Sequence, residues 1–458
     1  MFLEKIKTPG IAHLSYIVGD GDVAVVIDPR RDIELYCKIA SNEGVRIEHI
    51  FETHRNEDFV VGSIELAQRT GATIHHGAEL PFEYGETVEE GDEFFAGDLK
   101  FRVLETPGHT MESISLAVWD QNTGEQPVGV FTGDALFVNE VGRTDFYPDR
   151  AEEVAGMLYD SIFDKLLPLG DQTLLWPAHG AGSVCGDGMA SREFSTIGYE
   201  KTNNPALQEK NRKAFITRKT SEQHYKPPYF KRMEEYNLKG APPRPTMSGD
   251  VPLEPEIVAS ALKNGTVLLD LRSPEAIAGT FIPGSLAIPE HMLPVYGGYL
   301  LDYGQDIILI PETHHQLKHA LVHLERLGYD SVIGYLKGGL HTWETSGRMY
   351  GRIKAVHASE LKMRLEIENP PILLDVRKKS EFETARLPGA KHIFLGELPD
   401  QLNELPKDRT IITFCGSGQR AIIAASILLK NGFESVEDCL GSMQACMAIG
   451  CKTKTEDS

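Results

Sequence analysis

Short apolar segments alternate with longer amphipathic stretches over residues 1 to about 205. Each apolar segment is short enough to be a buried strand rather than a helix. Because helical stretches separate these strands, the pattern predicts an α/β domain. The clearest apolar segments are Ala24–Asp28, Ile47–His54, Leu116–Asp120 and Thr173–His179.

The composition changes between Lys210 and Arg244. This stretch is first locally basic and then rich in proline and glycine, ending in KGAPPRP. Such segments are typical of linkers between domains. We place the boundary between Lys239 and Asp250, so that residues 1–245 form the first domain together with its linker.

The remainder of the chain contains an internal repeat. TVLLDLRSPEAIAGTFIPGSLAIP begins at Thr266 and matches PILLDVRKKSEFETARLPGAKHIF, which begins at Pro371, at an offset of about 105 residues. A further pair of matching segments begins at Asp306 and Thr410. Three matched blocks in the same order predict two similar α/β domains, at residues 251–351 and 353–458.

The composition is that of an acidic globular protein. The 458 residues carry a net charge of −21, and 41% of them are hydrophobic. A negative field repels nucleic-acid phosphates and anionic lipids, and no apolar run approaches the ~20 residues of a transmembrane helix. Six cysteines without a CxxC pair suit a reducing compartment. We therefore expect a cytoplasmic enzyme that binds neither nucleic acid nor membranes.

Potential metal ligands follow four of the predicted strands. Imidazole and carboxylate groups are the usual ligands of zinc and iron in proteins. Loop residues at the ends of strands converge on one edge of a sheet, so these side chains are expected to lie together. They are His54 and Asp58 in THRNEDF, His109 in TPGHT, Asp134 in FTGD and His179 in WPAHG.

These ordered motifs resemble those of the metallo-β-lactamase superfamily over Ile11 to His179. The resemblance implies an αββα sandwich for the first domain. The family pattern THxHxDH is altered here, because Asn56 and Phe59 stand at two ligand positions. A pair of adjacent divalent ions needs several nitrogen donors and a bridging carboxylate. The sequence therefore lacks two of the ligands expected for a two-zinc hydrolase site.

The set His54, His109 and Asp134 is nevertheless complete for one metal. Two histidines and one carboxylate form the facial triad of non-haem iron(II) oxygenases. The persulfide dioxygenase branch of the superfamily has its iron ligands at these positions, so the resemblance implies a single Fe(2+) in each chain. Asp58 and His179 would then orient water or the ligands. A decayed site that binds no metal remains an alternative.

Three further residues are candidates for substrate binding. Arg143 in GRTDF, a motif that resembles one of the same branch, either binds a carboxylate or thiolate of the substrate or forms a salt bridge with Asp145. Tyr199 and Lys201 lie in STIGYEKTNNP, where the family shapes its thiol pocket.

The two repeat copies resemble rhodanese domains. In the second copy, CGSGQR places Cys415 between a buried strand and a helix, and inward-facing amides would stabilise a thiolate or persulfide there. Four residues separate Cys415 from Arg420, where phosphatase-type loops have five, so the loop favours sulfur transfer. Arg420 would bind thiosulfate or sulfite, or form an ion pair. The residues between them, which we expect to form the cradle, are Gly416, Ser417, Gly418 and Gln419.

The first copy has Pro311 at the position of Cys415 and is expected to be catalytically silent, a spacer or docking platform. The other cysteines of the second copy have no distinctive spacing, and packing roles are favoured over a sulfur relay. These are Cys439, Cys446 and Cys451.

Together, the resemblances imply a persulfide dioxygenase fused to a sulfurtransferase. Its expected substrates are O2 and a thiol persulfide, such as that of glutathione or coenzyme A, and its expected products are sulfite and, through Cys415, thiosulfate. One alternative is a zinc or dimetal thioester hydrolase of the glyoxalase II kind, with separate sulfur transfer. Another is a non-enzymatic persulfide carrier. A homo-oligomer is expected from the family.

Overall fold

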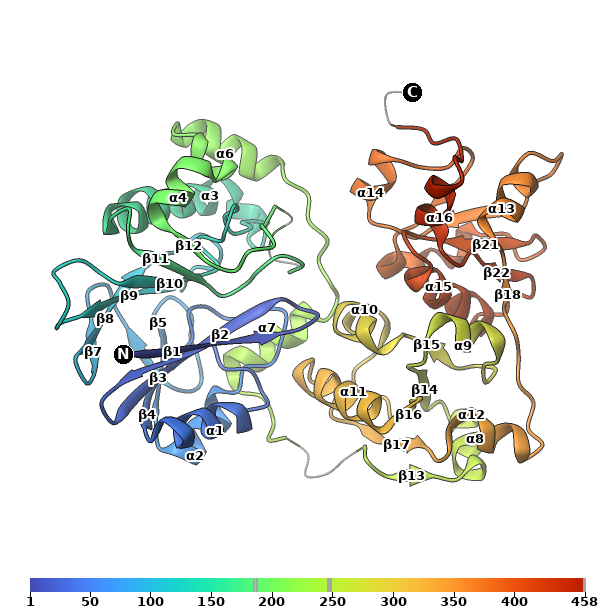
Figure 1. Cartoon of the computed structure of the whole chain (residues 1–458), viewed down its shortest axis with the longest axis horizontal. Helices are drawn as coiled ribbons and strands as arrows, with labels where there is room; N and C mark the ends of the chain where they lie inside the picture. Colours follow the sequence, from blue (N-terminus) through green and yellow to red (C-terminus); the bar gives the residue numbers. More distant parts are fainter. Residues whose placement is uncertain (184–185, 187, 245–248, 456–458) are drawn as a thin grey trace. The chain divides into compact units, whose positions relative to one another are not determined.

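The computed structural model describes residues 1–183, 186, 188–244 and 249–455 (Figure 1). The chain divides into two compact units. The first comprises Met1–Pro243 with Arg326–Gly328, and the second comprises Arg244–Glu325 with Tyr329–Ser458. Residues 245–248, close in the sequence to the boundary between Pro243 and Arg244, lie outside the described part of the chain. The three domain ranges expected from the sequence remain predictions.

The N-terminal unit is built on two six-stranded sheets. The strands of the first sheet, in spatial order, are β1 (Phe2–Thr8), β2 (His13–Asp20), β3 (Val23–Ile27), β4 (Arg46–Phe51), β5 (Thr73–Gly77) and β6 (Glu86–Val88). Those of the second are β12 (Ser195–Thr196), β11 (Leu174–Pro177), β10 (Gly129–Gly133), β9 (Ile114–Asp120), β8 (Leu99–Glu105) and β7 (Glu93–Ala96).

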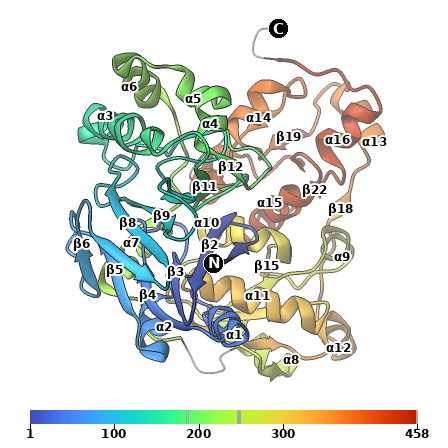
Figure 2. The same cartoon turned by 60° about the vertical axis from the view of Figure 1, so that its left-hand side comes forward.

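Helices cover the outer faces of these sheets (Figures 1 and 2). On the first sheet lie α1 (Glu34–Glu43) and α2 (Ser63–Thr70). The second sheet packs against α3 (Ala151–Asp160), α4 (Ile197–Asn203), α5 (Pro205–Gln208) and α6 (Arg212–Ser221). Helix α7 (Phe230–Lys239) follows α6 in the sequence. This is the αββα sandwich that the resemblance implied, and the expected fold class is confirmed.

The apolar runs in the sequence reflect strands that are buried on both faces. In β3, Val25 and Ile27 pack between the two sheets, whereas Ala24 and Val26 pack under the helices. Successive side chains of a strand point to opposite faces, so a strand covered on both sides needs an uninterrupted apolar sequence. The segment AVVI satisfies this requirement.

The C-terminal unit contains two five-stranded parallel sheets with the same strand order. The first sheet has the order β13 (Pro252–Leu253), β17 (Val332–Leu336), β16 (Ile307–Ile310), β14 (Val267–Asp270) and β15 (Leu286–Ala287). The second has the order β18 (Lys354–Ala355), β22 (Val436–Asp438), β21 (Ile411–Phe414), β19 (Ile372–Asp375) and β20 (Lys391–His392).

The helices of this unit repeat in the same way. The first copy contains α8 (Pro255–Lys263), α9 (Pro274–Gly279), α10 (Leu293–Leu300), α11 (His314–Arg326) and α12 (Gly339–Thr345). The second contains α13 (Ala358–Leu365), α14 (Lys379–Thr384), the 3-10 helix η5 (Leu395–Glu404), α15 (Gln419–Lys430) and α16 (Ser442–Ala448).

The repeated Leu-Leu-Asp-x-Arg motif has a structural purpose in both copies. Arg272 donates to Asp270 at 2.6 Å and to the carbonyl of Thr280 at 2.6 Å. Arg377 donates in the same way to Asp375 at 2.6 Å and to the carbonyl of Ala385 at 2.7 Å. Each buried ion pair thus fastens the end of a central strand to the following helix, which explains why this sequence recurs.

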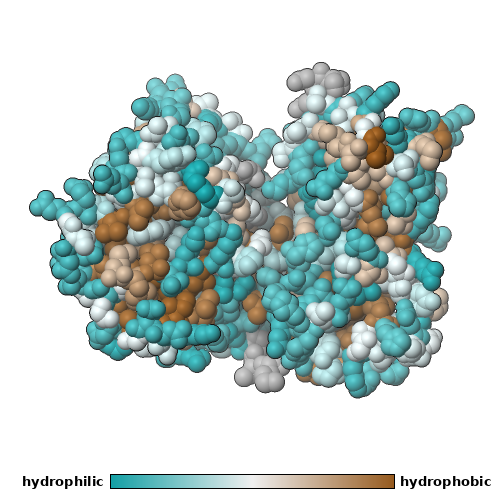
Figure 3. Space-filling model, in the orientation of Figure 1, coloured by the Kyte–Doolittle hydropathy of each residue, from teal (hydrophilic) through white to brown (hydrophobic). Residues whose placement is uncertain are grey.

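The surface drawn in Figure 3 is largely hydrophilic, with smaller apolar areas. This agrees with a chain in which 25% of the residues are charged. Among the described residues, no helix combines the length and the apolar character needed to cross a membrane.

Candidate metal centre and cysteine loop

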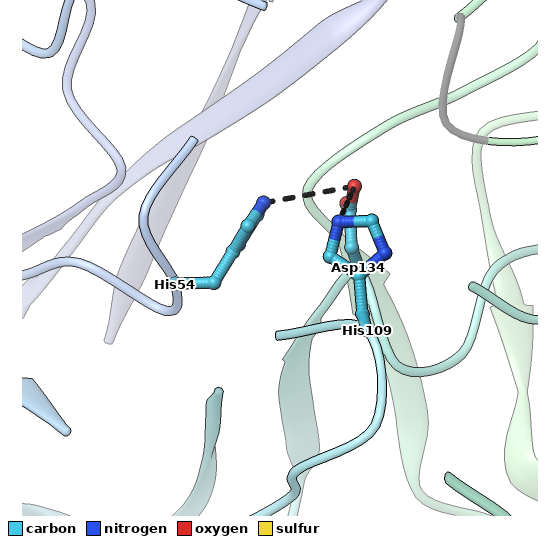
Figure 4. Close-up of side chains that lie close together, drawn as sticks. All are labelled: His54, His109 and Asp134. Atoms are coloured by element: carbon cyan, nitrogen blue, oxygen red, sulfur yellow. Dashed lines mark ion pairs between the residues drawn. The ribbon is translucent and has the colours of Figure 1, made fainter. Parts of the chain in front are cut away.

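Three side chains from the ends of three strands meet at one buried point (Figure 4). His54 follows β4, His109 follows β8 and Asp134 directly follows β10. The Nε2 atom of His109 lies 3.4 Å from Oδ2 of Asp134, and Nε2 of His54 lies 3.6 Å from the same oxygen. One potential ligand atom of each residue lies within 4.8 Å of the other two.

These three atoms fit a divalent cation. His54 Nε2, His109 Nε2 and Asp134 Oδ2 are buried and have no hydrogen-bond partner. Leaving a buried polar atom unpaired costs about 1–3 kcal/mol, and a cation placed between the three atoms would satisfy them together. Burial lowers the pKa of His54 to about 3, so its imidazole is neutral, as a metal ligand must be.

The other ring nitrogens of the two histidines are held by neighbours. His54 Nδ1 lies 2.9 Å from the hydroxyl of Thr53, which itself donates to Asp28 at 2.8 Å. His109 Nδ1 lies 3.0 Å from the carbonyl oxygen of Arg143. Since these acceptors place the ring proton on Nδ1, the Nε2 lone pairs face the centre.

His179 joins the two aspartates of the site. The parallel pairing of β10 and β11 sets Gly133 opposite Pro177, which brings Asp134 and His179 to the same sheet edge. His179 Nδ1 lies 2.7 Å from Asp134, and its Nε2 lies 3.0 Å from Asp58. Burial lowers the pKa of His179, but the charges of the two carboxylates outweigh it and raise the pKa well above 6.5. This raised pKa favours the protonated ring, which can donate to both carboxylates.

The neighbouring positions do not build a second metal site. Asp58 and His179 bind one another, and the ring of Phe59 packs against His13 with centroids 4.0 Å apart. The side-chain amide of Asn56 donates to the backbone carbonyl of His54 at 3.3 Å. Within the described part of the chain, His54, His109 and Asp134 are the only group of three or more potential ligands. The geometry favours one ion.

The candidate substrate residues have other partners. Arg143 is buried and forms a bidentate salt bridge with Asp145 at 2.6 and 2.7 Å. It also lines a cavity of about 260 Å³ together with Lys219 and His224. Lys201 pairs with Asp171 at 3.3 Å on the exposed surface. Tyr199 is exposed and lies under the guanidinium of Arg192. Substrate binding by Arg143, Tyr199 and Lys201 remains a prediction.

Cys415 occupies a tight loop between β21 and α15. The thiol is buried, and the amide of Gly418 donates to its sulfur at 3.1 Å. The amide of Cys415 donates to the hydroxyl of Ser442 at 3.0 Å. Gly418 has a φ of 94° and is the N-cap of α15, so the positive end of the helix dipole also faces the sulfur. An anionic sulfur is stabilised in this loop. The cradle roles of Gly416, Ser417 and Gln419 remain predictions.

Arg420 has a partner within its own repeat copy. Its guanidinium forms a bidentate salt bridge with Glu381 at 2.5 and 2.8 Å. The sequence left an ion pair open for Arg420 but did not indicate its partner, because Glu381 belongs to a different helix, α14.

The remaining cysteines of this copy lie in its hydrophobic core or pack against it. Cys439 and Cys446 are buried in its hydrophobic core, which also packs against Cys451. Burial raises the pKa of Cys439 to about 12 and that of Cys446 further. These surroundings agree with the packing roles favoured from the sequence.

The two family models that match this chain cover different units of it. The model of the metallo-β-lactamase superfamily matches residues 8–179, and that of the rhodanese-like domain matches residues 254–346 and 357–448. A crystal structure of a metallo-β-lactamase from Staphylococcus aureus subsp. aureus COL is 33% identical, with a TM-score of 0.65. The similarity covers 74% of this chain and 99% of that one. The chain belongs to the metallo-β-lactamase superfamily. It also carries two rhodanese-like domains.

Relatives of this superfamily member include two kinds of enzyme. The mitochondrial persulfide dioxygenase ETHE1 of Bos taurus is 28% identical over 219 residues, which are 45% of this chain and 76% of the relative. A hydroxyacylglutathione hydrolase of Dictyostelium discoideum is 27% identical over 171 residues, 36% of this chain and 62% of the relative. The family expected from the sequence is confirmed, with persulfide dioxygenases among its relatives.

One buried carboxylate near the candidate metal ligands was not anticipated. Oε2 of Glu57 lies 3.7 Å from Nε2 of His109, and neither carboxylate oxygen of Glu57 has a hydrogen-bond partner. Glu57 occupies a position to which the family pattern assigns no ligand. Nothing in the sequence distinguishes it from a solvent-facing residue, because its burial depends on how the loop after β4 folds.

Proposed function

We propose that this protein oxidises a low-molecular-weight thiol persulfide at a single ferrous ion and transfers sulfur through Cys415. The observation that carries the proposal is the convergence of three unpartnered ligand atoms from His54, His109 and Asp134. The remaining family ligands, Asp58 and His179, are engaged with each other. Persulfide dioxygenases among the relatives and the rhodanese-like domains support both enzyme activities.

Ferrous iron, when bound by two histidines and a carboxylate, supplies open coordination positions and the electrons that activate dioxygen. The chain itself supplies the imidazoles of His54 and His109 and one anionic oxygen from Asp134. The Nδ1 and Nε2 atoms of His179 hydrogen-bond to Asp134 and Asp58, respectively. These bonds fix the orientation of the Asp134 carboxylate. The burial of all three ligands keeps bulk water away from the reacting sulfur.

The persulfide of glutathione or coenzyme A is the proposed substrate, with sulfite as the product. Both thiols carry negative charges. The cavity beside Arg143 is lined by Lys219 and His224, which both pair with Glu222, and by Glu140. The backbone carbonyl of Arg143 also binds the metal ligand His109, so this cavity adjoins the centre. Arg143 is the candidate for contact with the substrate, although its guanidinium already donates to Asp145 and to the carbonyl of Tyr225, so substrate binding would have to exchange one of these contacts.

Cys415 carries the proposed second reaction. Its thiolate attacks the outer sulfur of a persulfide, the S–S bond of that persulfide breaks, and the thiol leaves. Sulfite then attacks the outer sulfur of the resulting cysteine persulfide and leaves as thiosulfate, which restores the thiol. Joining the two sites in one chain raises the effective concentration of sulfite at Cys415. A cytoplasmic location and a homo-oligomer remain expectations.

The main alternative is a two-metal thioester hydrolase, since hydroxyacylglutathione hydrolases are also relatives. The residues at two ligand positions of the family pattern argue against it, because neither Asn56 nor Phe59 offers an imidazole to a second ion. A carrier without a metal is the other alternative. Elemental analysis separates the three: about one iron per chain supports oxidation, two zinc ions support hydrolysis, and none supports a carrier.

A further inference from the structure

Glu57 is a buried carboxylate whose oxygens make no hydrogen bond. Its side chain has no exposed surface, and both oxygens lack a hydrogen-bond partner. The guanidinium of Arg55 lies 3.7 Å from Oε1, beyond hydrogen-bond distance, and the same nitrogen is 3.7 Å from Glu234. Burying a carboxylate is costly unless a cation or hydrogen bonds compensate its charge. The described neighbours of Glu57 supply only this distant, shared guanidinium, so the carboxylate needs a closer cation.

The carboxylate of Glu57 lies on the metal-binding side of His109. Its Oε2 is 3.7 Å from Nε2 of His109, and Oδ2 of Asp134 is 3.4 Å from the same nitrogen. Atoms that bind one ion at about 2.0–2.2 Å are about 3 to 4 Å apart, so Glu57 and His109 are spaced as two ligands of one ion. Glu57 is not among the three residues whose ligand atoms all lie within 4.8 Å of one another. A rotation of its side chain toward the other two must therefore accompany ligation.

The backbone on both sides of Glu57 is fixed by α7, a helix far from it in the sequence. Asn237 of α7 is buried, and its side-chain amide donates to the carbonyls of Asn56 and Phe59, at 2.7 Å each. The side-chain oxygen of Asn237 accepts from the amide of Val61 at 3.0 Å. The loop after β4 is thus held at three points, and these contacts fix the backbone from which Glu57 extends.

We propose that Glu57 is a fourth protein ligand of the iron centre and supplies its second carboxylate. Two histidines and two carboxylates leave two positions of a six-coordinate ferrous ion open for the reactants, and the two negative charges balance the ion. Zinc with four protein ligands forms a closed site of the structural type, so this ligand set suits iron chemistry better than zinc hydrolysis. The inference rests on the proposed function, which places the iron at His54, His109 and Asp134.

The first test measures the affinity of the metal-free full chain for Co²⁺ alone, a stand-in for Fe²⁺ that air does not readily oxidise. Glu57→Gln keeps the shape of the side chain and removes its charge. Glu52→Gln is the matched control, since Glu52 is a buried carboxylate after the same strand that accepts from Tyr84 at 2.9 Å. Glu57→Gln should weaken Co²⁺ binding about 10- to 100-fold, and Glu52→Gln should leave it unchanged. An unchanged affinity in Glu57→Gln, or an equal loss in both variants, would overturn the proposal.

Thermal unfolding of the metal-free proteins shows whether the variant folds. Glu57→Gln removes an uncompensated buried charge, so its unfolding temperature without metal should equal or exceed that of the unaltered protein. A lower unfolding temperature without metal would assign Glu57 a structural role instead of ligation.

A crystal structure of the Co²⁺-loaded full chain tests the ligation directly. The ion should lie about 2.0–2.2 Å from one carboxylate oxygen of Glu57 and contact the other three ligands. An ion bound by His54, His109 and Asp134 with Glu57 out of contact would overturn the inference.

Neither the affinity nor the crystal structure depends on turnover. If the unaltered protein bound one ion but did not oxidise persulfides, the proposed function would be wrong, and these measurements would still decide the role of Glu57. If Glu57→Gln bound Co²⁺ as tightly as the unaltered protein, Glu57 would not be a ligand, and the proposed oxidation would still stand.

Discussion

His179 donates to Oδ1 of Asp134 at 2.7 Å, and this leaves Oδ2 of the same carboxylate unpartnered and directed toward His54 and His109. His179 stands at a metal-ligand position of the superfamily pattern. Here its hydrogen bond to Oδ1 determines that Oδ2 is the oxygen of Asp134 available to a metal ion. A change in His179 should therefore act on the metal centre without removing any of the three proposed ligands.

His179→Asn is expected to weaken iron binding by about 10- to 100-fold, because the orientation of Asp134 is lost. Anaerobic titration of the metal-free protein with Fe(2+) measures the affinity. His76→Asn is a matched control, since His76 is a buried histidine of β5 that hydrogen-bonds the carbonyl of Tyr84. Equal affinities in His179→Asn and the unaltered protein would show that Asp134 needs no support.

His109→Ala should abolish persulfide-dependent oxygen uptake and leave sulfur transfer from thiosulfate to cyanide within about twofold of the unaltered protein. The reason is that His109 supplies a proposed iron ligand in the N-terminal unit, whereas Cys415 lies in the C-terminal unit. An oxygen electrode and a thiocyanate assay measure the two activities. Persistent oxygen uptake in this variant would remove His109 from the oxidation site.

Cys415→Ser should have the opposite effect. Oxygen uptake is expected to remain within about twofold, while the product changes from thiosulfate to sulfite, because serine cannot carry a sulfane sulfur. Chromatographic separation of the two anions after a fixed oxygen consumption provides the measurement. Cys439→Ser is the control, as Cys439 is a buried cysteine of the same core. Loss of oxygen uptake in Cys415→Ser would contradict the division of labour between the two units.

Asp438 should make the stability of the C-terminal unit dependent on pH. Burial raises the pKa of this carboxyl from 3.8 to about 7, although Thr413 donates a hydrogen bond to it. Between these values the folded chain binds more protons than the unfolded chain, so the free energy of unfolding falls as the pH rises from about 4 to about 7, by at most about 4 kcal/mol.

Asp438→Asn mimics the protonated carboxyl and should flatten this dependence. Thermal unfolding midpoints of both proteins, measured from pH 4.5 to pH 8, provide the comparison. The unaltered protein should lose more thermal stability over this range than the variant does. Parallel curves would show that Asp438 ionises in the folded state as readily as in water.

The convergence of the proposed metal ligands could be predicted from the sequence, because all three residues lie just after the ends of strands. His54, His109 and Asp134 each follow an apolar strand, and loops at strand ends share one edge of a sheet. The repeated Leu-Leu-Asp-x-Arg segments likewise predicted two similar α/β domains, and the structure contains two parallel sheets of the same strand order. Both inferences use local patterns that a single chain reveals without knowledge of distant contacts.

The partners of the charged residues were not accessible in this way. Arg420 pairs with Glu381 from another helix. Whether a buried arginine binds a substrate or a carboxylate depends on which side chains the fold brings within about 3 Å, and no periodicity encodes that. Glu57 was missed for the same reason.

The most direct test of single-iron persulfide oxidation is a titration of the metal-free protein with Fe(2+) under anaerobic conditions, followed by oxygen uptake with glutathione persulfide. Uptake should rise in proportion to bound iron and reach its maximum at about one ion per chain. Maximal uptake only with two ions bound, uptake supported by zinc, or no uptake with iron bound at His54, His109 and Asp134 would contradict it.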